Sequence, residues 1–549
     1  MGDRLVAWVC SDRGWRAMGF ALAAIAAVAA VCCLGYSIPK PLIGPHGFRQ
    51  TQNAISSYYS VKEHASVFHN IMPVLGRPWD LPTELPLFQY LAGCLYWLSG
   101  MPLDACGRLI SAVFWLACVV LCMPLLRLLD VQEHDLWIPC VILLSCPLYL
   151  FWGATYMMET MALFLSLSFL YAVMRCSIAV GKHGEERLPL TILRDNRFWL
   201  WFLVGLSTGT LAALQKASTW IIAFGVAALF VSWAGRQTRP WRLALMNLWF
   251  LPMFGIPYFV ARSWFEYGDV LKKQNPFVRD MFVFSNEKFR HWNYGTFEQK
   301  VSAETWGVIV SHMQEGVFLS IPPFDHLAMF VVLIAGAIVA AKRRPHIAFL
   351  LAAFTVGPLV FTNLYYVHNY YVCATGVWML LAIGLAIVGV AEKQSQLRWP
   401  RLSALVITIA VAGAGFGTWA TGYLPILQSF ATHGQLKAAW TEPVQRMIPL
   451  PRTLLILGSD WNPVALYYAE RKGIGWPDSM LQEFPGPRFK EAMSLLRPEE
   501  AIGAVVFNER LVTEANAPAI AKILDDLGMS ENGMPTPFGV LFLAMDLQQ

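Results

Sequence analysis

Residues 85–99, LPLFQYLAGCLYWLS, are apolar along most of their length but number only 15, whereas a helix needs about 20 such residues to cross a bilayer. Eleven further apolar runs flank this stretch and are candidate membrane spans. They cover residues 17–38, 107–127, 136–152, 157–175, 198–214, 217–234, 243–264, 325–341, 346–364, 369–390 and 402–423. Whether 85–99 is a twelfth span decides on which side of the membrane every later loop lies.

Basic residues settle this topology, because Lys and Arg collect in cytoplasmic loops. The basic clusters are Arg4/Arg13/Arg16, Arg127, the stretch 175–197, Arg236/Arg239/Arg242, Lys342/Arg343/Arg344 and Lys393/Arg398/Arg401. If 85–99 lies outside the bilayer, all of them fall on one side; if it spans, Arg127 and every later cluster change sides. We therefore predict eleven transmembrane helices, with the N-terminus in the cytoplasm and the C-terminus outside. Residues 85–99 then form an amphipathic helix in the membrane interface.

The composition supports a multi-pass membrane protein and excludes several other classes. The 549 residues have a mean hydropathy of +0.48 and only 14% charged residues, whereas a soluble domain has about 25%. The net charge of +5 is small, and no basic cluster interleaved with aromatic residues indicates nucleic-acid binding. The cysteines lie almost entirely in or beside apolar runs, so we expect neither a disulfide framework nor a thiolate metal site.

The predicted fold is an all-α polytopic domain, residues 1–424, followed by a small soluble domain, residues 425–549. The first domain carries two long exterior loops, 39–106 and 265–324. In the second domain, apolar runs at 452–460 (RTLLILGSD), 501–509 (AIGAVVFNE) and 540–547 (VLFLAMDL) predict strands, and 462–473 (NPVALYYAERKG) predicts a helix. Strands that alternate with helices are typical of an α/β domain.

Ionisable side chains near membrane spans are costly to bury and mark functional sites by default. With the predicted topology, a set of them gathers at the outer face, from six regions of the chain. They are His46, Arg49, Glu84, Glu159, Lys216, Arg262, Glu266 and His368. Structural explanations stay open for each: Glu84 as a helix cap, Lys216 as a snorkelling residue, Glu159 as its ion-pair partner, His368 as an interfacial histidine and Arg262 as an interface anchor.

The set has the chemistry of a transfer reaction at a membrane surface. Cations at the edge of the outer leaflet suit a phosphate group. Carboxylates and an imidazole beside them suit the removal of a proton from an attacking hydroxyl. The pattern therefore predicts transfer from a lipid-linked phosphosugar to an acceptor outside the cytoplasm.

Five segments resemble the motifs of a known family, in the same order along the chain. They are HGFRQTQ (46–52), TELPLFQYLAGCLYW (83–97), Glu159 at the start of a span, GLSTGTLAALQK (205–216) and HNYY (368–371). The chain thereby resembles bacterial GT-C glycosyltransferases of family 39 type, which are related to the protein O-mannosyltransferases and the aminoarabinose transferase of lipid A. The resemblance covers residues 17 to about 390.

The resemblance implies an enzyme of the bacterial inner membrane, with its C-terminal domain in the periplasm. It implies three partners: a polyprenyl-phosphate-sugar donor, an acceptor that is a lipid, a glycan or a protein, and the surrounding membrane lipids. The sugar is transferred to a hydroxyl of the acceptor with inversion. The residues implied to bind the donor phosphate are Arg49, Lys216 and His368. Those implied to bind substrate are Gln50, Gln52, Glu159, Arg262, Tyr370 and Tyr371.

The general base is left open, because the family's catalytic acid aligns with His46 and its acidic neighbour with Gly47. Either His46 is the base, for which an ordinary pKa near 6.5 is suitable, or Glu84 is the base; we slightly favour Glu84. Since the acidic pair is missing, we predict no cofactor, although a divalent metal stays possible. The main alternative is a transporter or flippase, but the charges gather at one surface and no inverted repeat is visible.

Overall fold

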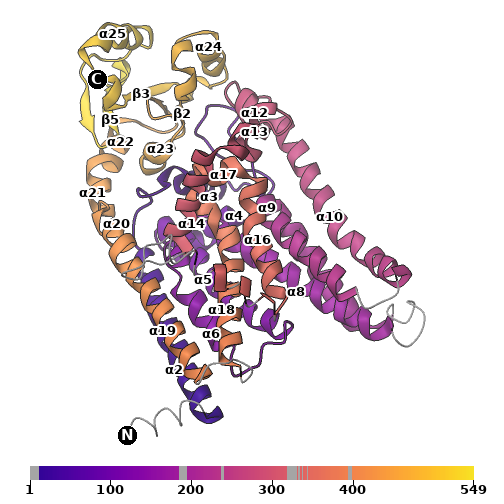
Figure 1. Cartoon of the computed structure of the whole chain (residues 1–549). Helices are drawn as coiled ribbons and strands as arrows, with labels where there is room; N and C mark the ends of the chain where they lie inside the picture. Colours follow the sequence, from indigo (N-terminus) through magenta and orange to yellow (C-terminus); the bar gives the residue numbers. More distant parts are fainter. Residues whose placement is uncertain are drawn as a thin grey trace, which may run out of the picture. The chain divides into compact units, whose positions relative to one another are not determined.

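The computed structural model describes residues 11–184, 194–235, 240–317, 399–548 and, apart from 332–333, 337, 340 and 343, residues 331–392. The chain forms two compact units (Figure 1). The helical unit comprises Met1–Ile38, Arg108–Ser263 and Arg290–Pro425, and the sheet unit comprises Pro39–Gly107, Trp264–Phe289 and Ile426–Gln549.

Helices of membrane-spanning length dominate the helical unit, which confirms a multi-pass helical protein. Within the described ranges, six helical stretches are long and apolar enough to cross a bilayer. They are Asp12–Ser37 (α2), Leu103–Arg127 (α5), Glu159–Val180 of α8 (Glu159–Gly184), Asn196–Trp233 of α9 (Asn196–Gly235), Asn369–Ala391, which includes α18 (Cys373–Ala391), and Pro400–Met447, which begins with α19 (Pro400–Thr418).

The remaining predicted spans have three outcomes. Span 243–264 lies in one helix, α10 (Pro240–Lys272). Spans 136–152 and 346–364 are each broken into two helices, α6 (Trp137–Ser145) with α7 (Pro147–Trp152), and α16 (His346–Val360) with α17 (Thr362–Val367). Span 325–341 falls mostly outside the described residues. The number of eleven spans and their orientation therefore stay predictions.

Two helical stretches of this unit are interrupted, one beside a proline and one at a lysine. Pro147 disfavours the helical conformation of the residue before it, and Cys146 is accordingly extended, with φ −68° and ψ 120°. In α9 the chain leaves the helical conformation at Lys216, with φ −161° and ψ 90°. Lys216 therefore lies at the junction of two helical segments, between the predicted spans 198–214 and 217–234.

Small residues allow α9 to approach its neighbours closely. A Cβ on Gly205 would lie 2.1 Å from Met253 Cε on α10, and one on Gly209 would lie 2.7 Å from the ring of Phe169 on α8. Such close helix packing replaces the hydrophobic driving force that is missing between helices in lipid. The spacing of these glycines thus fixes the helices that carry Glu159 and Lys216.

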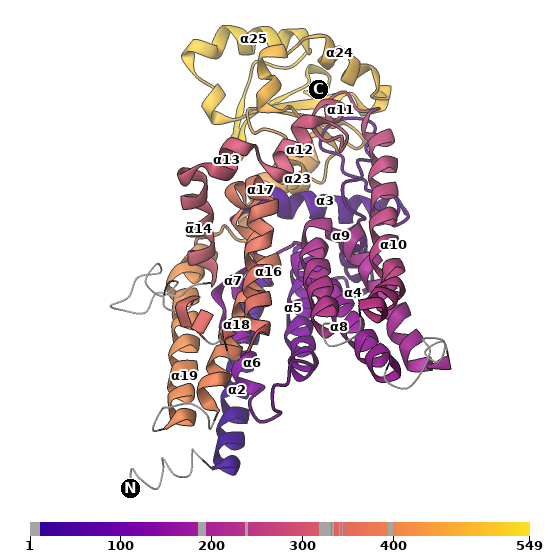
Figure 2. The same ribbon diagram turned by 45° about the vertical axis from the view of Figure 1, so that its right-hand side comes forward.

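The sheet unit contains a five-stranded mixed sheet with the order β2-β1-β3-β5-β4. Its strands are β1 (Thr453–Leu457), β2 (Gly473–Gly475), β3 (Ile502–Phe507), β4 (Met534–Thr536) and β5 (Gly539–Leu543). β1 pairs in parallel with β2 and β3, whereas β5 pairs antiparallel with β3 and β4. The predicted strands correspond to β1, β3 and β5, and the predicted helix contains the short α23 (Val464–Ala469). Helices α24 (Pro487–Ser494) and α25 (Ala517–Asp526) lie on the opposite side of the sheet from α23 (Figure 2).

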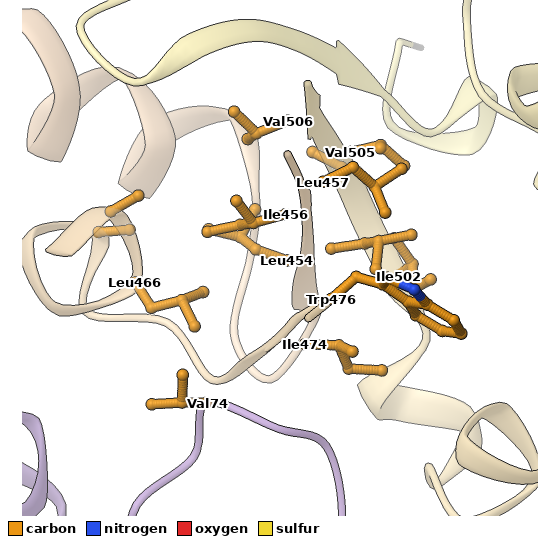
Figure 3. Close-up of a cluster of buried hydrophobic side chains, with 14 of the residues drawn as sticks. Val74, Leu454, Ile456, Leu457, Leu466, Ile474, Trp476, Ile502, Val505 and Val506 are labelled. Carbon is orange, nitrogen blue, oxygen red and sulfur yellow. The ribbon is translucent and has the colours of Figure 1, made fainter. Parts of the chain in front are cut away.

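The core of the sheet unit is built from both the C-terminal sheet and the first loop (Figure 3). All five residues of β1 are buried, as expected for a parallel strand covered on both faces. Val74 of the first loop joins the cluster, and its carbonyl accepts a hydrogen bond from Gly475 N at 2.6 Å. Arg77 reaches Glu500 through two hydrogen bonds of 2.5 and 2.6 Å. These contacts hold residues 70–81 against the edge of β2.

Two helices complete the first loop, α3 (Gly47–Lys62) and α4 (Leu87–Ser99). The stretch 85–99 is therefore helical, as predicted. Gln89 of α4 donates to Asn53 of α3 at 2.9 Å, between two buried side chains.

Candidate active site

The heptad HGFRQTQ forms the start of α3 rather than an irregular loop. His46 is the residue before the helix and has a left-handed conformation, with φ 50° and ψ 33°. Gln50 Nε2 donates to the carbonyl of Pro45 at 3.0 Å, so its buried side chain fixes this entry. Thr51 Oγ1 donates to the carbonyl of Gly47 at 2.7 Å. Gln50, a predicted substrate ligand, thus has a structural contact of its own.

Three of the predicted residues meet on the first loop. Arg49 donates to Glu84 Oε1 at 2.6 Å through one guanidinium nitrogen and to Gln52 Oε1 at 2.6 Å through the other. Arg49 and Gln52 are three residues apart on α3 and therefore share a helix face, while Glu84 precedes α4. The side chains of Arg49 and Glu84 are half-buried, with exposed fractions of 22% and 24%, so the pair is shielded from water but reachable by a ligand.

A buried lysine that the sequence analysis did not single out lies near this pair. Lys272, the last residue of α10, is fully buried, and its Nζ has no hydrogen-bond partner in the described part of the chain. It lies 3.9 Å from the centre of the Phe284 ring. Burial lowers the pKa of Lys272 to about 8, and the carboxylates of Asp269 and Glu84 oppose this shift.

Asp269 and the first loop build the pocket around Lys272. Asp269 accepts hydrogen bonds from the backbone N of Phe284 at 2.7 Å and of Ser285 at 3.0 Å, which holds the Phe284 ring in place. Trp264 Nε1 donates to the carbonyl of Thr83 at 3.3 Å, beside Glu84. The only signal in the sequence is a lysine within the predicted exterior loop 265–324, which does not reveal burial.

The other predicted residues form a second cluster in the helical unit. Lys216, at the break in α9, donates to Glu159 at the start of α8, and both side chains are about 94% buried, with exposed fractions of 7% and 6%. Lys216 Nζ lies 4.1 Å from the centre of the Tyr371 ring and 5.2 Å from that of Tyr370. The His368 ring stacks on Tyr370 at 5.1 Å between centroids. One ammonium, one carboxylate and three rings thus lie together, with the ion pair and the Tyr370 ring buried and the other two rings partly buried.

Some predicted residues lie outside these two clusters. Arg262 is exposed on α10, unlike the buried Lys216 and Glu159 of the same unit. His46 lines a cavity of about 520 Å3 in the sheet unit, together with residues of the C-terminal domain. Within the described ranges, no group of three His, Cys, Asp or Glu side chains is placed to hold a metal ion. That the two clusters belong to one active site stays a prediction.

The arrangement can bind anions and handle protons. Arg49 and Lys216 each donate a hydrogen bond to a carboxylate. A phosphate oxygen is equivalent to that carboxylate as an acceptor. Displacing the carboxylate would leave it as a proton acceptor next to the bound anion.

Comparison with solved structures identifies the fold. ArnT from Cupriavidus metallidurans, in its structure bound to undecaprenyl phosphate, matches with a TM-score of 0.54 and 13% identity, over 96% of this chain and 98% of that one. The Archaeoglobus fulgidus oligosaccharyltransferase, tethered with an acceptor peptide containing the NVT sequon, matches with a TM-score of 0.50 and 14% identity, over 96% and 74%. The same archaeal enzyme, AglB, in complex with an inhibitory peptide and a dolichol-phosphate, gives 0.50 and 13% over the same shares.

Sequence comparisons give no closer link, since no protein-family model and no curated protein matches the chain. At these identities the likeness shows a common architecture, over nearly the whole chain. The predicted relation to family 39 therefore stays a prediction. The protein is a multi-span helical membrane protein with a small C-terminal mixed sheet, and its fold is that of the GT-C glycosyltransferases.

Proposed function

We propose that the protein is a membrane glycosyltransferase that moves a sugar from a polyprenyl phosphate to a hydroxyl of an acceptor outside the cytoplasm. The observation that carries the proposal is the cluster of Lys216, Glu159, Tyr370, Tyr371 and His368, of which the first three are buried and the last two partly buried. Burying a lysine within a membrane protein costs free energy, and such residues mark functional sites by default. The likeness in fold to a structure bound to undecaprenyl phosphate supports a lipid phosphate as its ligand.

In the proposed reaction, the acceptor hydroxyl gives its proton to a carboxylate and its oxygen attacks the anomeric carbon of the sugar. The bond from that carbon to the phosphate oxygen breaks, and polyprenyl phosphate leaves with the bonding electrons. Attack from the face opposite to the phosphate inverts the anomeric configuration. Lys216, Arg49 and His368 hold the phosphate, while Glu159, Tyr370 and Tyr371 contact the sugar; Gln50, Gln52 and Arg262 complete the substrate ligands.

Glu84 is our candidate for the base in preference to His46. Glu84 lies against the proposed phosphate ligand Arg49 at 2.6 Å, whereas His46 lines the separate cavity at the start of α3. If Glu84 is the base, Glu84→Gln reduces transfer by about a hundredfold or more, while His46→Gln retains much of the activity. If His46→Gln reduced transfer more strongly than Glu84→Gln, His46 would be the base.

Binding of the donor lipid tests the proposal. Undecaprenyl phosphate is added to the purified full-length protein in nanodiscs, and retention is measured by native mass spectrometry. Lys216→Met keeps the length of the side chain but removes its charge, so we expect at least about tenfold weaker retention, the effect of losing one hydrogen bond between charged groups. Lys288→Met, at an exposed position, is the matched control. Equal retention by all three proteins would refute the assignment of Lys216.

A transporter or flippase is the second candidate, favoured by the broken helix at Lys216. Transporters bind substrates where discontinuous helices end near buried polar groups. Proteoliposomes that contain a fluorescent polyprenyl phosphate separate the two functions. Protein-dependent movement of the lipid between leaflets, without sugar transfer to any acceptor, would favour transport.

A further inference from the structure

A cavity of about 520 Å3 lies in the sheet unit, and neither Arg49 nor Glu84 is among its lining residues. Its volume is within the range of about 300–1,000 Å3 that is usual for small-molecule sites. Four segments of the chain line it: the residues around the start of α3, those that follow β1, those that follow β3, and the turn into β5. The lining residues are Ile43, Gly44, His46, Gly47, Phe48, Ser459, Asn462, Val464, Asn508, Glu509, Pro537, Phe538 and Gly539.

The position of this cavity in the sheet is typical of a ligand site. β1 ends at Leu457 and β3 at Phe507, and these two parallel strands are neighbours in the sheet. The chain runs from β1 to β2 on one side, whereas β3 pairs on the other side. Ligands of open α/β sheets bind outside the carboxyl ends of the strands at such a reversal of strand order.

The polar groups of the cavity are fixed in place by the local backbone. Gly458, with φ +80°, turns the chain after β1 and brings Ser459 to the cavity. Asn508 Nδ2 donates to Ser459 Oγ at 3.1 Å. Asn462 Oδ1 accepts from the backbone N of Val464 at 3.1 Å, which orients its amide NH2 group. The cavity therefore presents hydroxyl and carboxamide groups in a fixed arrangement.

Two aromatic side chains of the lining are also held in place. The Phe48 ring packs edge-on against Trp461, with centroids 4.5 Å apart, and the Phe538 ring against Trp440 at 5.2 Å. No Lys or Arg is among the lining residues, so the cavity lacks the cations that bind phosphate or carboxylate groups. The lining also includes the carboxylate of Glu509, which can accept hydrogen bonds from hydroxyls. Hydrogen-bonding groups without a cation, beside rigid aromatic rings, suit a ligand with many hydroxyls and apolar C–H faces.

We propose that this cavity binds a sugar residue of the acceptor, so that the acceptor is a glycan or a glycolipid. The proposal rests on the proposed glycosyl transfer and names the acceptor class within it. The amides of Asn462 and Asn508 and the hydroxyl of Ser459 bond to sugar hydroxyls. Phe48 and Phe538 contact the C–H face of the pyranose ring. His46 lines the same cavity three residues before Arg49, which connects acceptor binding to the proposed reaction site.

Saturation-transfer NMR on the full-length protein tests this proposal. The protein is held in nanodiscs, because sugar-based detergents would compete for the cavity. The probes are maltose, lactose and N,N′-diacetylchitobiose, all neutral. We expect at least one to give signals from its ring C–H protons. Asn462→Ala and Phe538→Ala should weaken that binding about fivefold, the effect of losing one hydrogen bond or ring contact.

Controls separate this proposal from the proposed function. Asn532→Ala and Phe297→Ala change exposed positions of the same residue types and should leave the sugar signals unchanged. The cavity variants should retain undecaprenyl phosphate like the parent protein, and Lys216→Met should retain the sugar signals. Absence of signals from all three probes, or signals that survive both cavity substitutions, would overturn the proposal. Binding of an unglycosylated peptide in the cavity, with no binding of any of the three sugars, would also overturn it.

Discussion

The substitution Lys272→Met should make the protein more stable and less active. Methionine fills a similar volume and suits an irregular apolar pocket, whereas Lys272 carries an ammonium into a site with no exposed surface. Its Nζ lies 3.9 Å from the centre of the Phe284 ring and interacts electrostatically with the carboxylates of Asp269 and Glu84. A charge that lowers stability is retained where function needs it.

The size of the effect follows from the pKa and from the aromatic contact. Burial lowers the pKa of Lys272 from 10.5 to about 8, a shift that corresponds to about 3 kcal/mol of destabilisation at pH 7. The Phe284 ring, 3.9 Å from Nζ, restores about 2 kcal/mol at a desolvated site. We therefore expect Lys272→Met to stabilise the protein by about 1–3 kcal/mol, a rise in melting temperature of roughly 1–3 °C for a chain of 549 residues.

The pH dependence gives the sign of the effect. Between pH 8 and 10.5 the unfolded chain binds a proton at this lysine, whereas the folded chain does not, so the parent protein gains stability as the pH rises through this window. Below pH 8 the lysine is protonated in both states and the full destabilisation persists. The advantage of Lys272→Met should thus be largest at pH 7 and shrink towards pH 10.5.

Differential scanning fluorimetry of the protein in detergent, from pH 7 to 10.5, measures these differences. Lys273→Met is the control, since Lys273 is adjacent but exposed, and it should leave the melting temperature almost unchanged. A melting temperature of Lys272→Met equal to or below that of the parent at pH 7 would refute the reasoning. Full transfer activity in the stabilised variant would show that Lys272 has no role at Glu84.

Three further changes probe the other charged groups. Glu84→Gln should reduce the rate of sugar transfer by about a hundredfold or more. Its melting temperature, measured by fluorimetry, should stay unchanged. Lys216→Met leaves Glu159 buried and unpaired, so we expect a loss of about 3–5 kcal/mol; addition of Glu159→Gln should restore the melting temperature but not the transfer. Burial raises the pKa of Glu500, but hydrogen bonds from Arg77 and from the backbone outweigh it and leave the pKa below its ordinary value. The pair's stabilisation is therefore lost as the pH falls below about 4.5. Arg77→Ala should accordingly reduce the fall of the melting temperature with pH below about pH 4.5 and leave its slope at pH 6 unchanged.

Helices and strands with strong apolar patterns could be predicted from the sequence. β1, β3 and β5 have continuous apolar runs, because their faces are buried. β2 was missed because it reads GIG and glycine has little strand preference. β2 exists because the first loop covers it, where Gly475 donates to Val74. Such pairing joins segments about 400 residues apart, and no local pattern reports it.

The candidate site shows the same division between residue type and residue environment. From the sequence, charged groups were expected at loops and helix ends, and a pairing of Glu159 with Lys216 was one of the alternatives. The structure contains this pair. It did not reveal that Arg49 would be held by Glu84. It also passed over Lys272, because burial depends on the distant Phe284 and on the loop at Pro82. Chemistry can thus be read from residue types, but the state of each charge depends on packing.

In the proposed mechanism, the two ion pairs prevent both an unpaired charge and the removal of a proton before the donor binds. Arg49 holds Glu84, and Lys216 holds Glu159, so each cation is neutralised when no lipid phosphate is bound. In the proposed mechanism the donor phosphate competes for Arg49 and thereby frees Glu84 to accept the proton. The base would then become active only when a sugar is present to be transferred.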